Sequence, residues 1–313
     1  MYVSTRGKRR PCGQTGLDLV KQLQIENFLR LYNVDILHCQ EINIVEDSFT
    51  DCNYLTSSYN ILTNNAQNKY GTCSFVANNF QAENIKMDTN GRVLAFDIEN
   101  ITFCNVYLHS GSDQTMKNGR ENYAAEVIPQ ILINCKEFGC VGGDWNSIID
   151  SKDTTKNAAQ KQSKCLKRLV KTFSWVDSYR NLHPQTQQFS RYYDNVVHGE
   201  GASRLDRMYH FGGLTIVEAF YVGVAFSDHL PLIVKVRLPQ NMSKLQSIKS
   251  RPLFKSKPNV IQDEIFKSRL RENINLWAQV KNNGLNVLSW WELIIKPGIK
   301  KLLIERGKEI NKE

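Results

Sequence analysis

The feature that most constrains this chain is a repeated pattern in which a short apolar stretch ends in an isolated polar side chain. Its clearest form is V-G-G-D-W-N-S-I-I at residues 141–149, where Asp144 and Asn146 follow a short apolar run. Both side chains should leave the end of a buried strand and point into one cleft, and the glycines allow the backbone to approach a phosphate. A G-D-x-N sequence alone is also typical of a capped turn, so its meaning depends on the other strand ends.

Four other apolar stretches carry polar side chains at one end. These side chains are Glu41, Tyr107, Asp206, and the neighbouring Asp228 and His229. Each has an ordinary interpretation as a cap, a surface residue or a packed ring. Their recurrence at the ends of separate strands instead predicts a two-sheet α/β sandwich that gathers its loops into one site.

The hydrophobic periodicity predicts the elements of this sandwich. Helices are expected at residues 17–34, 120–137 and 163–173, with the last continuing to a stop at Pro184. Strands, separated by turns, are expected at residues 35–41, 54–62, 71–77, 93–98 and 101–107. A very short first strand is expected at residues 2–5.

Composition excludes several classes of protein. The chain of 313 residues has 41% hydrophobic and 23% charged residues, as globular proteins do. It has no apolar run near the ~20 residues that span a bilayer and no signal-peptide core, so we expect no membrane contact and an intracellular location, with the nucleus favoured. Its eight cysteines include no C-x-x-C pair, which favours reduced thiols over a disulfide framework or a zinc site.

The net charge of +9 is concentrated towards the C-terminus. Residues 244–313 contain 15 Lys and Arg against 7 Asp and Glu, whereas residues 1–243 contain 25 against 24. A basic extension on a nearly neutral domain favours a polyanionic partner, nucleic acid before membrane. A solvated helical face is the alternative explanation.

The polar groups at the strand ends indicate a type of chemistry. Four carboxylates, one amide, one imidazole and one phenol offer mostly hard oxygen ligands, which suit Mg²⁺ or Mn²⁺ better than Zn²⁺. Phosphoryl transfer needs such a set: a metal to neutralise charge, a carboxylate to hold or deprotonate water, and donors for the phosphate oxygens. No serine lies in a nucleophile-elbow context, which disfavours a serine hydrolase.

In order and spacing, these residues resemble the endonuclease/exonuclease/phosphatase superfamily, and within it the apurinic-type endonuclease domain of non-LTR (LINE-type) retrotransposon proteins. The resemblance covers about residues 1–239. It rests on C-Q-E ending at Glu41, G-R-V at 91–93, Tyr107, G-D-W-N at 143–146, D-S-Y-R-N-L-H-P at 177–184, R-L-D at 204–206 and S-D-H-L-P at 227–231.

The resemblance implies a metal-dependent DNA endonuclease that nicks one strand and leaves 3′-OH and 5′-phosphate ends. Glu41 and Asp228 would then hold the divalent metal. Asp144 would orient or deprotonate the attacking water, and Asn146 would stabilise the transition-state phosphate.

The resemblance also assigns the residues around the phosphate. Asp206 would pair with His229, which contacts the scissile phosphate, and Tyr107 would support that phosphate. Arg204, next to this group in the sequence, is a further candidate for a contact with nucleic acid.

One position departs from the superfamily pattern. Members carry Asn on the first strand in an N-x-x-G context, whereas S-T-R-G at 4–7 places Ser4 there, with only three residues before it. A hydroxyl is a poorer metal ligand than an amide. Two alternatives therefore stay open beside the endonuclease: a catalytically degenerate nucleic-acid-binding relic, and a superfamily phosphodiesterase or phosphatase with a non-nucleic substrate.

The C-terminal region is expected to lie outside the sandwich. Residues 240–259 predict a linker, and residues 260–313 predict a basic helical extension with a break at Pro297. The sequence S-W-W-E at 289–292 is similar to the connector that precedes the reverse transcriptase in LINE-type proteins, although no Y-x-D-D polymerase signature is present. DNA or element RNA would then contact Trp290, Trp291, Lys300 and Lys301, the alternative being that the tryptophans pack on a further domain.

Overall fold

The computed structural model describes residues 2–6, 19–42, 55, 58–65, 71–155, 162–193, 200–238, 258–281 and 290–310. The chain divides into two compact units. The first consists of residues 1–17 and 32–249, and the second of residues 18–31 and 250–313. The candidate residues at the strand ends all belong to the first unit.

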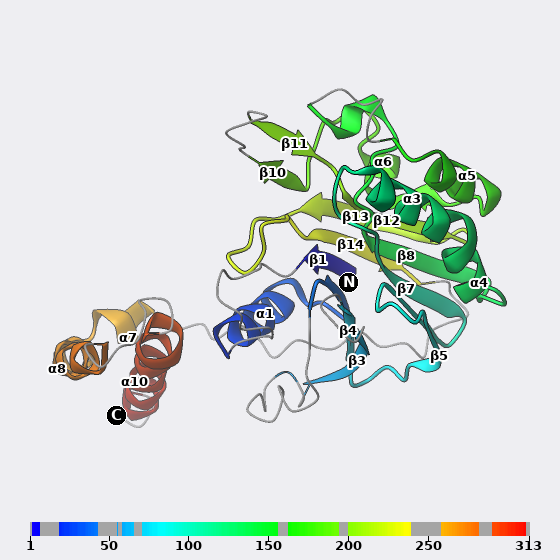
Figure 1. The fold of residues 1–313 in the computed structure, drawn as a ribbon. Helices are drawn as coiled ribbons and strands as arrows, with labels where there is room; N and C mark the ends of the chain where they lie inside the picture. Colours follow the sequence, from blue (N-terminus) through cyan, green and yellow to red (C-terminus); the bar gives the residue numbers. More distant parts are fainter. Residues whose placement is uncertain are drawn as a thin grey trace. The chain divides into compact units, whose positions relative to one another are not determined.

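The first unit is built on two six-stranded sheets and one two-stranded sheet (Figure 1). The first sheet has the order β13-β14-β1-β2-β4-β3, with β1 (Tyr2–Arg6), β2 (Ile36–Gln40), β3 (Tyr59–Asn65), β4 (Gly71–Ala77), β13 (Thr215–Tyr221) and β14 (Leu232–Arg237). The second has the order β5-β6-β7-β8-β12-β9, with β5 (Glu83–Met87), β6 (Val93–Ile98), β7 (Ile101–Tyr107), β8 (Phe138–Asp144), β9 (Val176–Asp177) and β12 (Asp206–Phe211). The small sheet pairs β10 (Arg191–Tyr193) with β11 (Gly201–Ser203).

The two large sheets face each other, which confirms the predicted α/β sandwich. Strands β1 and β2 lie against β8, and β4 lies against β7. The buried amide of Asn105, on β7, joins the two layers: its Nδ2 donates to the carbonyl oxygens of Cys39 at 3.1 Å and Cys73 at 2.9 Å, which belong to the first sheet. Gln40 Nε2 donates to Asn105 Oδ1 at 2.6 Å, so the amide is bonded at both ends.

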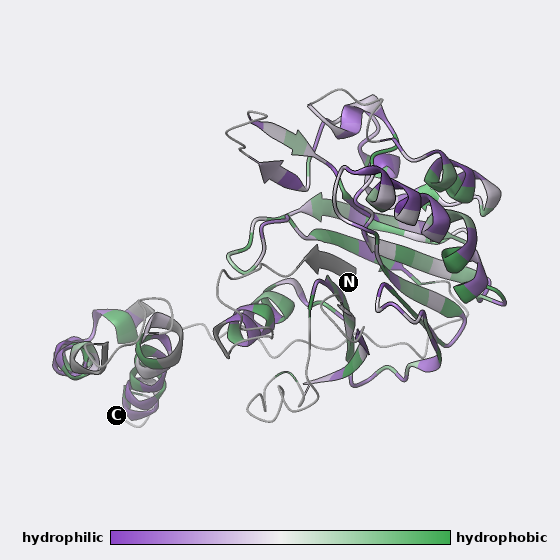
Figure 2. Ribbon diagram, viewed as in Figure 1, coloured by the Kyte–Doolittle hydropathy of each residue, from purple (hydrophilic) through white to green (hydrophobic). Residues whose placement is uncertain are grey.

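Short helices cover the outer face of the second sheet (Figure 1). They are α3 (Gln114–Asn122), the π-helical turn η2 (Tyr123–Val127), α4 (Ile128–Ile131), α5 (Lys164–Thr172) and α6 (Ser178–Leu182). Figure 2 shows mostly hydrophobic strands in the sandwich and hydrophilic residues on these helices. Between sheet and helices, the ring of Trp145 packs edge-on against Trp175 and Tyr209, with ring centroids 6.3 and 5.2 Å apart. Leu166 and Leu169 anchor α5 in the same buried cluster.

The strands predicted at 71–77, 93–98 and 101–107 are confirmed with those bounds. The strand β5 was missed because its residues are largely exposed and its apolar alternation is limited to Ile85 and Met87. The helix predicted at 120–137 begins earlier, because the side chain of Asp113 caps α3 by accepting from Met116 N at 3.0 Å. It also ends earlier, at Ile131.

The predicted continuation of the 163–173 helix to Pro184 was wrong. Ser174 adopts a left-handed φ of 51°, and the chain then enters β9. A separate helix, α6, follows because Asp177 caps it by accepting from Arg180 N at 3.0 Å.

The second unit is helical and confirms a helical C-terminal part. Its elements are α1 (Leu19–Tyr32, whose last residue belongs to the first unit), α7 (Pro258–Gln262), α8 (Glu264–Lys281), the π-helical turn η6 (Trp291–Ile295) and α10 (Lys296–Ile310). The expected break at Pro297 is a change of helix type and not a gap, because the π-helical turn η6 ends at Ile295 and α10 begins at Lys296, directly before this proline. The linker predicted at 240–259 lies outside the described residues except for its last two positions, which belong to α7.

Two expectations from composition can be checked on the described part of the chain. Its six cysteines, at positions 39, 73, 104, 135, 140 and 165, are free thiols, as predicted. Among the described helices, none combines the length and the apolar character that a bilayer crossing requires.

Candidate active site

The loop after β8 holds Asp144 and Asn146 in a fixed arrangement. Asn146 N donates to Asp144 Oδ1 and Asn146 Nδ2 donates to Asp144 Oδ2, each at 3.0 Å. Asn146 Nδ2 also donates to the Leu108 carbonyl at 2.9 Å, which ties the loop to the end of β7. Asn146 has φ 44°, a left-handed conformation that asparagine tolerates better than most residues. The buried Asp144 carboxylate is therefore aimed by the amide two residues later.

A glycine makes this approach possible. Gly143 has φ 148°, and a Cβ atom there would lie 1.8 Å from the Val106 carbonyl oxygen of β7. Strands β7 and β8 run parallel, with Tyr107 opposite Asp144 in the register. The tight contact thus places a tyrosine beside the acid at the same end of the sheet.

Tyr107 links this end of the second sheet to the first. Its hydroxyl donates a short hydrogen bond to Glu41 Oε1, directly after β2. Glu41 has φ 57°, which is unfavourable for a residue with a long side chain. The guanidinium of Arg92 lies 5.0 Å from the centroid of the Tyr107 ring. A strained acid, a phenol and a cation therefore meet where the two sheets end.

Asp206 and His229 form a buried pair. His229 Nδ1 lies 2.7 Å from Asp206 Oδ2, and both side chains are fully buried. Asp206 begins β12 opposite Asp144, whereas His229 precedes β14 of the first sheet. A carboxylate beside Nδ1 requires a proton on that nitrogen, so proton transfer by this ring would use Nε2.

The three groups Asp144, Asp206 and His229 converge. One ligand atom from each lies within 4.8 Å of the others, so the group could hold a metal ion. Asp206 Oδ1 is buried and has no hydrogen-bond partner among the described residues. An uncompensated buried carboxylate oxygen is costly, and a cation or a proton donor from a ligand would satisfy it.

Ser190 is a residue near the pair that sequence reasoning missed. Its Oγ accepts from Leu205 N at 2.9 Å and from Asp206 N at 3.0 Å, and its carbonyl accepts from Leu230 N at 2.7 Å. It therefore fixes the backbone on both sides of the Asp206–His229 contact. The neighbouring sequence Q-F-S-R offers no signal that could have found it.

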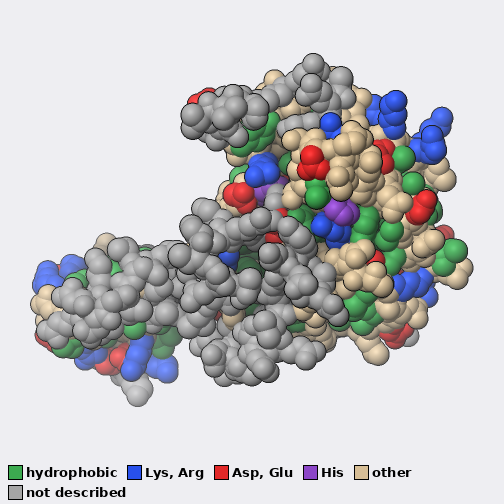
Figure 3. All heavy atoms as spheres, in the orientation of Figure 1, with side chains coloured by type: hydrophobic (Ala, Val, Ile, Leu, Met, Phe, Trp, Pro, Cys, Tyr) green, Lys and Arg blue, Asp and Glu red, His purple; other side chains and the backbone are tan. Residues whose placement is uncertain are grey.

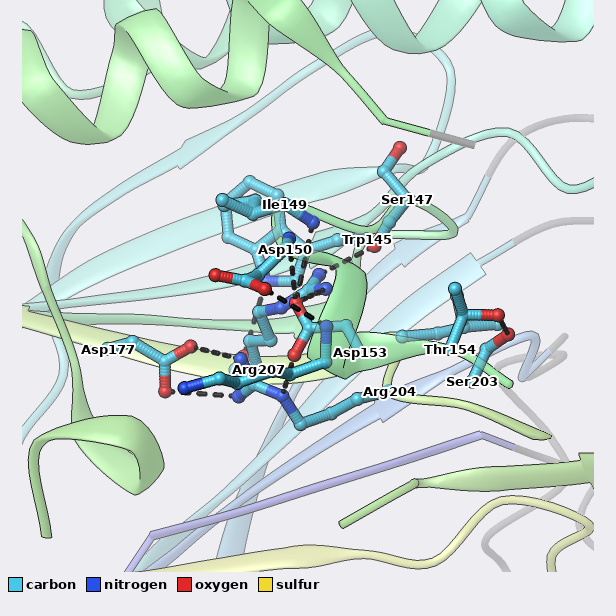
Figure 4. A network of polar contacts seen from close by, with 12 residues as sticks. Trp145, Ser147, Ile149, Asp150, Asp153, Thr154, Asp177, Ser203, Arg204 and Arg207 are labelled. Atoms are coloured by element: carbon cyan, nitrogen blue, oxygen red, sulfur yellow. Dashed lines mark hydrogen bonds and ion pairs between the residues drawn. The ribbon is translucent and has the colours of Figure 1, made fainter. Parts of the chain in front are cut away.

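A buried ion-pair network lies beside Asp206 on β12, and we call it the Asp153 network (Figure 4). Asp153 Oδ1 contacts Arg204 Nε at 2.8 Å and Arg180 Nη2 at 3.0 Å, and Asp153 Oδ2 contacts Arg207 Nη2 at 3.0 Å. Arg204 also bonds Asp177 through two parallel contacts of 3.1 and 2.7 Å. Burial by itself raises the pKa of the Asp153 carboxyl, but Arg207 and Arg204 outweigh it and hold that pKa well below its usual range.

This network changes the expected role of Arg204. The side chain is 2% exposed and bonded to two carboxylates, so its guanidinium holds β12 in place and does not face a ligand at the surface. An arginine between Ser203 and Leu205 carries no sequence signal of burial, because only the fold brings Asp153 and Asp177 beside it.

The converging group does not include the other predicted site residues. The side chain of Asp228 is 42% exposed and pairs with Arg191 Nη2 at 3.8 Å. In the second unit, Trp290 Nε1 donates to the Trp277 carbonyl at 2.6 Å and Trp291 is 47% exposed. Lys300 and Lys301 are exposed on α10.

No protein-family profile and no curated protein sequence matches this chain. Solved structures do. An AP endonuclease from Archaeoglobus fulgidus superposes with a TM-score of 0.62 at 16% identity, covering 76% of this chain and 99% of that protein. A 3'-5' exonuclease from Neisseria meningitidis gives a TM-score of 0.62 at 15% identity, with the same coverage. An AP endonuclease from Leishmania major gives 0.58 at 17%, covering 76% and 87%.

The chain has the endonuclease/exonuclease/phosphatase fold. At these identities the likeness establishes the fold, and the chemistry must be argued from the residues at the strand ends. The match spans nearly the full length of two of these proteins, so the sandwich is present as a whole.

Proposed function

We propose that this chain is a metal-dependent DNA endonuclease that hydrolyses a phosphodiester bond and nicks one strand. The observation that carries the proposal is the convergence of Asp144, Asp206 and His229 within 4.8 Å, with the Tyr107–Glu41 contact at the same end of the sheets. The activities named for the similar solved structures, AP endonuclease and 3'-5' exonuclease, belong to those proteins and support a nucleic-acid substrate here.

The donor set fits a hard divalent cation, Mg²⁺ or Mn²⁺, because its ligand atoms are mostly carboxylate oxygens. Both oxygens of Asp144 already accept from Asn146, and the His229 Nδ1 is engaged with Asp206. We assign the metal to Glu41 on the resemblance of the motifs, with Asp228 as the further predicted ligand; binding there would compete with the contacts to Tyr107 and Arg191. When bound, the cation would neutralise negative charge that develops on the phosphate.

Asp144 is assigned to the attacking water. Because Asn146 fixes both of its oxygens, the carboxylate is held in one orientation and can accept a proton from a water beside the phosphate. The Asn146 amide has two N–H donors, which bond Leu108 O and Asp144 Oδ2, so it would stabilise the phosphate by exchanging one of these acceptors for a phosphate oxygen as charge accumulates there.

His229 is assigned to the scissile phosphate. Asp206 holds its Nδ1 at 2.7 Å and would stabilise the protonated ring, which leaves Nε2 to donate to a phosphate oxygen or to the leaving group. Tyr107, fixed by Glu41 and covered by Arg92, would support the same phosphate from the other sheet.

We extend the proposal to a retrotransposon-derived nuclease of the LINE type that acts in the nucleus on DNA. The order of the motifs from Glu41 to His229 and the S-W-W-E sequence at 289–292 support this origin. In the second unit, Trp290, Trp291, Lys300 and Lys301 remain candidates for a contact with DNA or element RNA.

Nicking of supercoiled plasmid tests the proposal. The purified chain should relax the plasmid with Mg²⁺ and not with EDTA. Asp144→Ala and His229→Ala should each lower the rate by at least about 100-fold, the range expected for a lost acid–base group. Asp150→Ala is the matched control, because this exposed carboxylate lies on the same loop outside the converging group.

The outcome also separates the alternatives. A folded wild-type chain that binds DNA but never nicks it would contradict the endonuclease and favour a degenerate relic. Ser4→Asn would then be the informative variant, since the backbone of Ser4 lies in β1 opposite Leu232 and His38, in the centre of the first sheet. Unchanged nicking in both alanine variants would refute the assigned residues.

A further inference from the structure

Helix α5 carries a stripe of four cations on its exposed side. Lys164, Lys167, Arg168 and Lys171 are all exposed, and their spacing of i, i+3, i+4 and i+7 places them on one face of the helix. Figure 3 shows Lys and Arg side chains gathered at the edge of the molecule where α5 lies. We call these four residues the α5 stripe.

The described residues place no acidic partner in an ion pair with the α5 stripe. Within the described part of the chain no carboxylate forms an ion pair with any of its members, and the helix contains no acidic residue. Glu121 contacts the start of α5, but its Oε2 accepts from Cys165 N at 2.8 Å and, like the other described carboxylates, forms no ion pair with the stripe. A solvent-exposed helix face commonly carries both acidic and basic residues, whereas α5 carries only basic ones.

This arrangement works against the helix that carries it. Like charges three and four residues apart repel each other, and the stripe contains four such pairs. Lys164 also lies in the first helical turn, where the helix dipole disfavours a cation. A row of like charges that destabilises its own helix is expected where the charges bind a ligand.

The buried face of α5 distinguishes between two possible polyanionic partners, a membrane surface and a nucleic acid. Leu166 and Leu169 are buried in the cluster beneath the helix, together with Trp145 and Trp175. A membrane-surface helix inserts its apolar face into the lipid, and here that face is already used by the core. The stripe is therefore suited to phosphates of a nucleic acid that lies along the surface.

The stripe is also connected to the candidate site. Ser163, the N-cap of α5, donates through its backbone N–H to the Ile148 carbonyl at 3.3 Å. Ile148 is two residues after Asn146 in the loop that leaves β8. The start of α5 is therefore hydrogen-bonded to the segment that follows Asp144 and Asn146.

The charged residues of the second unit differ. Lys267 pairs with Glu264 at 2.6 Å, Arg269 with Glu309 at 2.9 Å, and the buried Arg306 with Asp263 at 2.9 Å. Part of the basic charge of that region is therefore neutralised internally, whereas the α5 stripe keeps its charge.

We propose that the α5 stripe is a second DNA-binding surface, which contacts phosphates of the duplex outside the reacting bond. It takes DNA as the partner from the proposed function but requires no catalysis. Its contacts are with the backbone, so they add affinity and orientation without sequence preference.

The test measures the salt dependence of duplex binding by fluorescence anisotropy, with EDTA present and in an Asp144→Ala background, so that failure to nick cannot affect the result. Each phosphate contact contributes about 0.9 to the slope of log K against log salt. Lys167→Gln/Lys171→Gln should lower the slope by up to about 1.8, and the fourfold Gln variant by up to about 3.6. Glutamine keeps the helix propensity and removes the charge.

A matched control removes two charges elsewhere. Lys235→Gln/Arg237→Gln changes two exposed cations of β14, one of which pairs with Glu218 at 3.2 Å, and should leave the slope unchanged. An unaltered slope in the fourfold α5 variant, with a wild-type circular dichroism spectrum, would overturn the proposal. Binding to phosphatidylserine vesicles that needs the stripe, with DNA binding independent of it, would overturn it in favour of a membrane contact.

Discussion

Replacing Asp153 by asparagine should destabilise the first unit strongly, although the residue does not belong to the converging group. The side chain is fully buried and accepts contacts from three guanidinium groups, those of Arg180, Arg204 and Arg207. The native network has three cations and two carboxylates, the second being Asp177. The substitution removes one of these two negative charges, so that Arg207, also fully buried, loses its carboxylate partner and keeps the neutral Ser147 carbonyl as an acceptor.

Removing one partner of a buried ion pair costs about 3–5 kcal/mol, and we expect the free energy of unfolding of Asp153→Asn to fall by this amount. With an m-value of about 3 kcal/mol/M, the midpoint of urea unfolding should fall by about 1–1.7 M at an unchanged m-value. Asp150→Asn is the matched control, because asparagine caps the 3₁₀ turn at Ser151–Asp153 as well as aspartate does, and its midpoint should not move.

The pH dependence of the stability provides a second test of the role of Asp153. The pKa of Asp153 is raised by burial but held well below its usual range by Arg207 and Arg204, so the folded state favours the charged form. Its contribution is complete above the unfolded pKa of about 4 and declines only as the pH falls below that value. A loss of less than about 1 kcal/mol in Asp153→Asn at neutral pH would refute the assignment of this residue as the centre of the network.

Asn146→Gly and Asn146→Ala should lower nicking alike and both lose the side-chain bonds to Leu108 and Asp144, but the alanine variant should be about 1 kcal/mol less stable than the glycine variant, because φ 44° is strained for alanine; equal stabilities would contradict this. Burial, then Arg92 and Arg120, lowers the pKa of His109 to about 4, so protonation favours unfolding. Wild type should lose more stability between about pH 6.5 and pH 4 than His109→Asn, which keeps the lowered pKa values of the buried His38 and of His210, as urea midpoints at both pH values would show. Mg²⁺ should raise the Tm of wild type more than that of Glu41→Gln, and equal shifts would refute Glu41 as a ligand. The fourfold Gln variant of α5 should melt no lower than wild type, since relief of four like-charge pairs is worth up to about 1–2 kcal/mol.

Continuous burial made part of the fold predictable from sequence. The strands at 71–77, 93–98 and 101–107 are buried at every position, so their apolar runs ended where the strands end. Polar residues at either end of such runs have few structural uses, and for this reason Asp144, Asp206 and His229 could be selected before their proximity was known. The edge strand β5, which is largely exposed, left no such signal.

The sequence could not predict which charged side chains pair with each other across long separations in the chain. Asp153 lies in S-K-D-T-T, a polar stretch typical of a surface turn, and its burial depends on arginines 27 to 54 positions away. The exposure of Asp228 and the internal use of Arg204 follow from the same limitation, because the partners of a charged side chain are chosen by the fold. The cationic face of α5 depends only on local spacing, since residues three, four and seven positions apart share a side of any helix.

The division of the candidate site between the two sheets has a consequence for folding. Tyr107, Asp144 and Asp206 belong to the second sheet, whereas Glu41 and His229 adjoin strands of the first. Either sheet alone therefore carries only a fragment of the constellation. A collapsed intermediate with complete secondary structure but undocked layers would be inactive, so recovery of nicking during refolding would time the docking of the layers, separately from the formation of the strands.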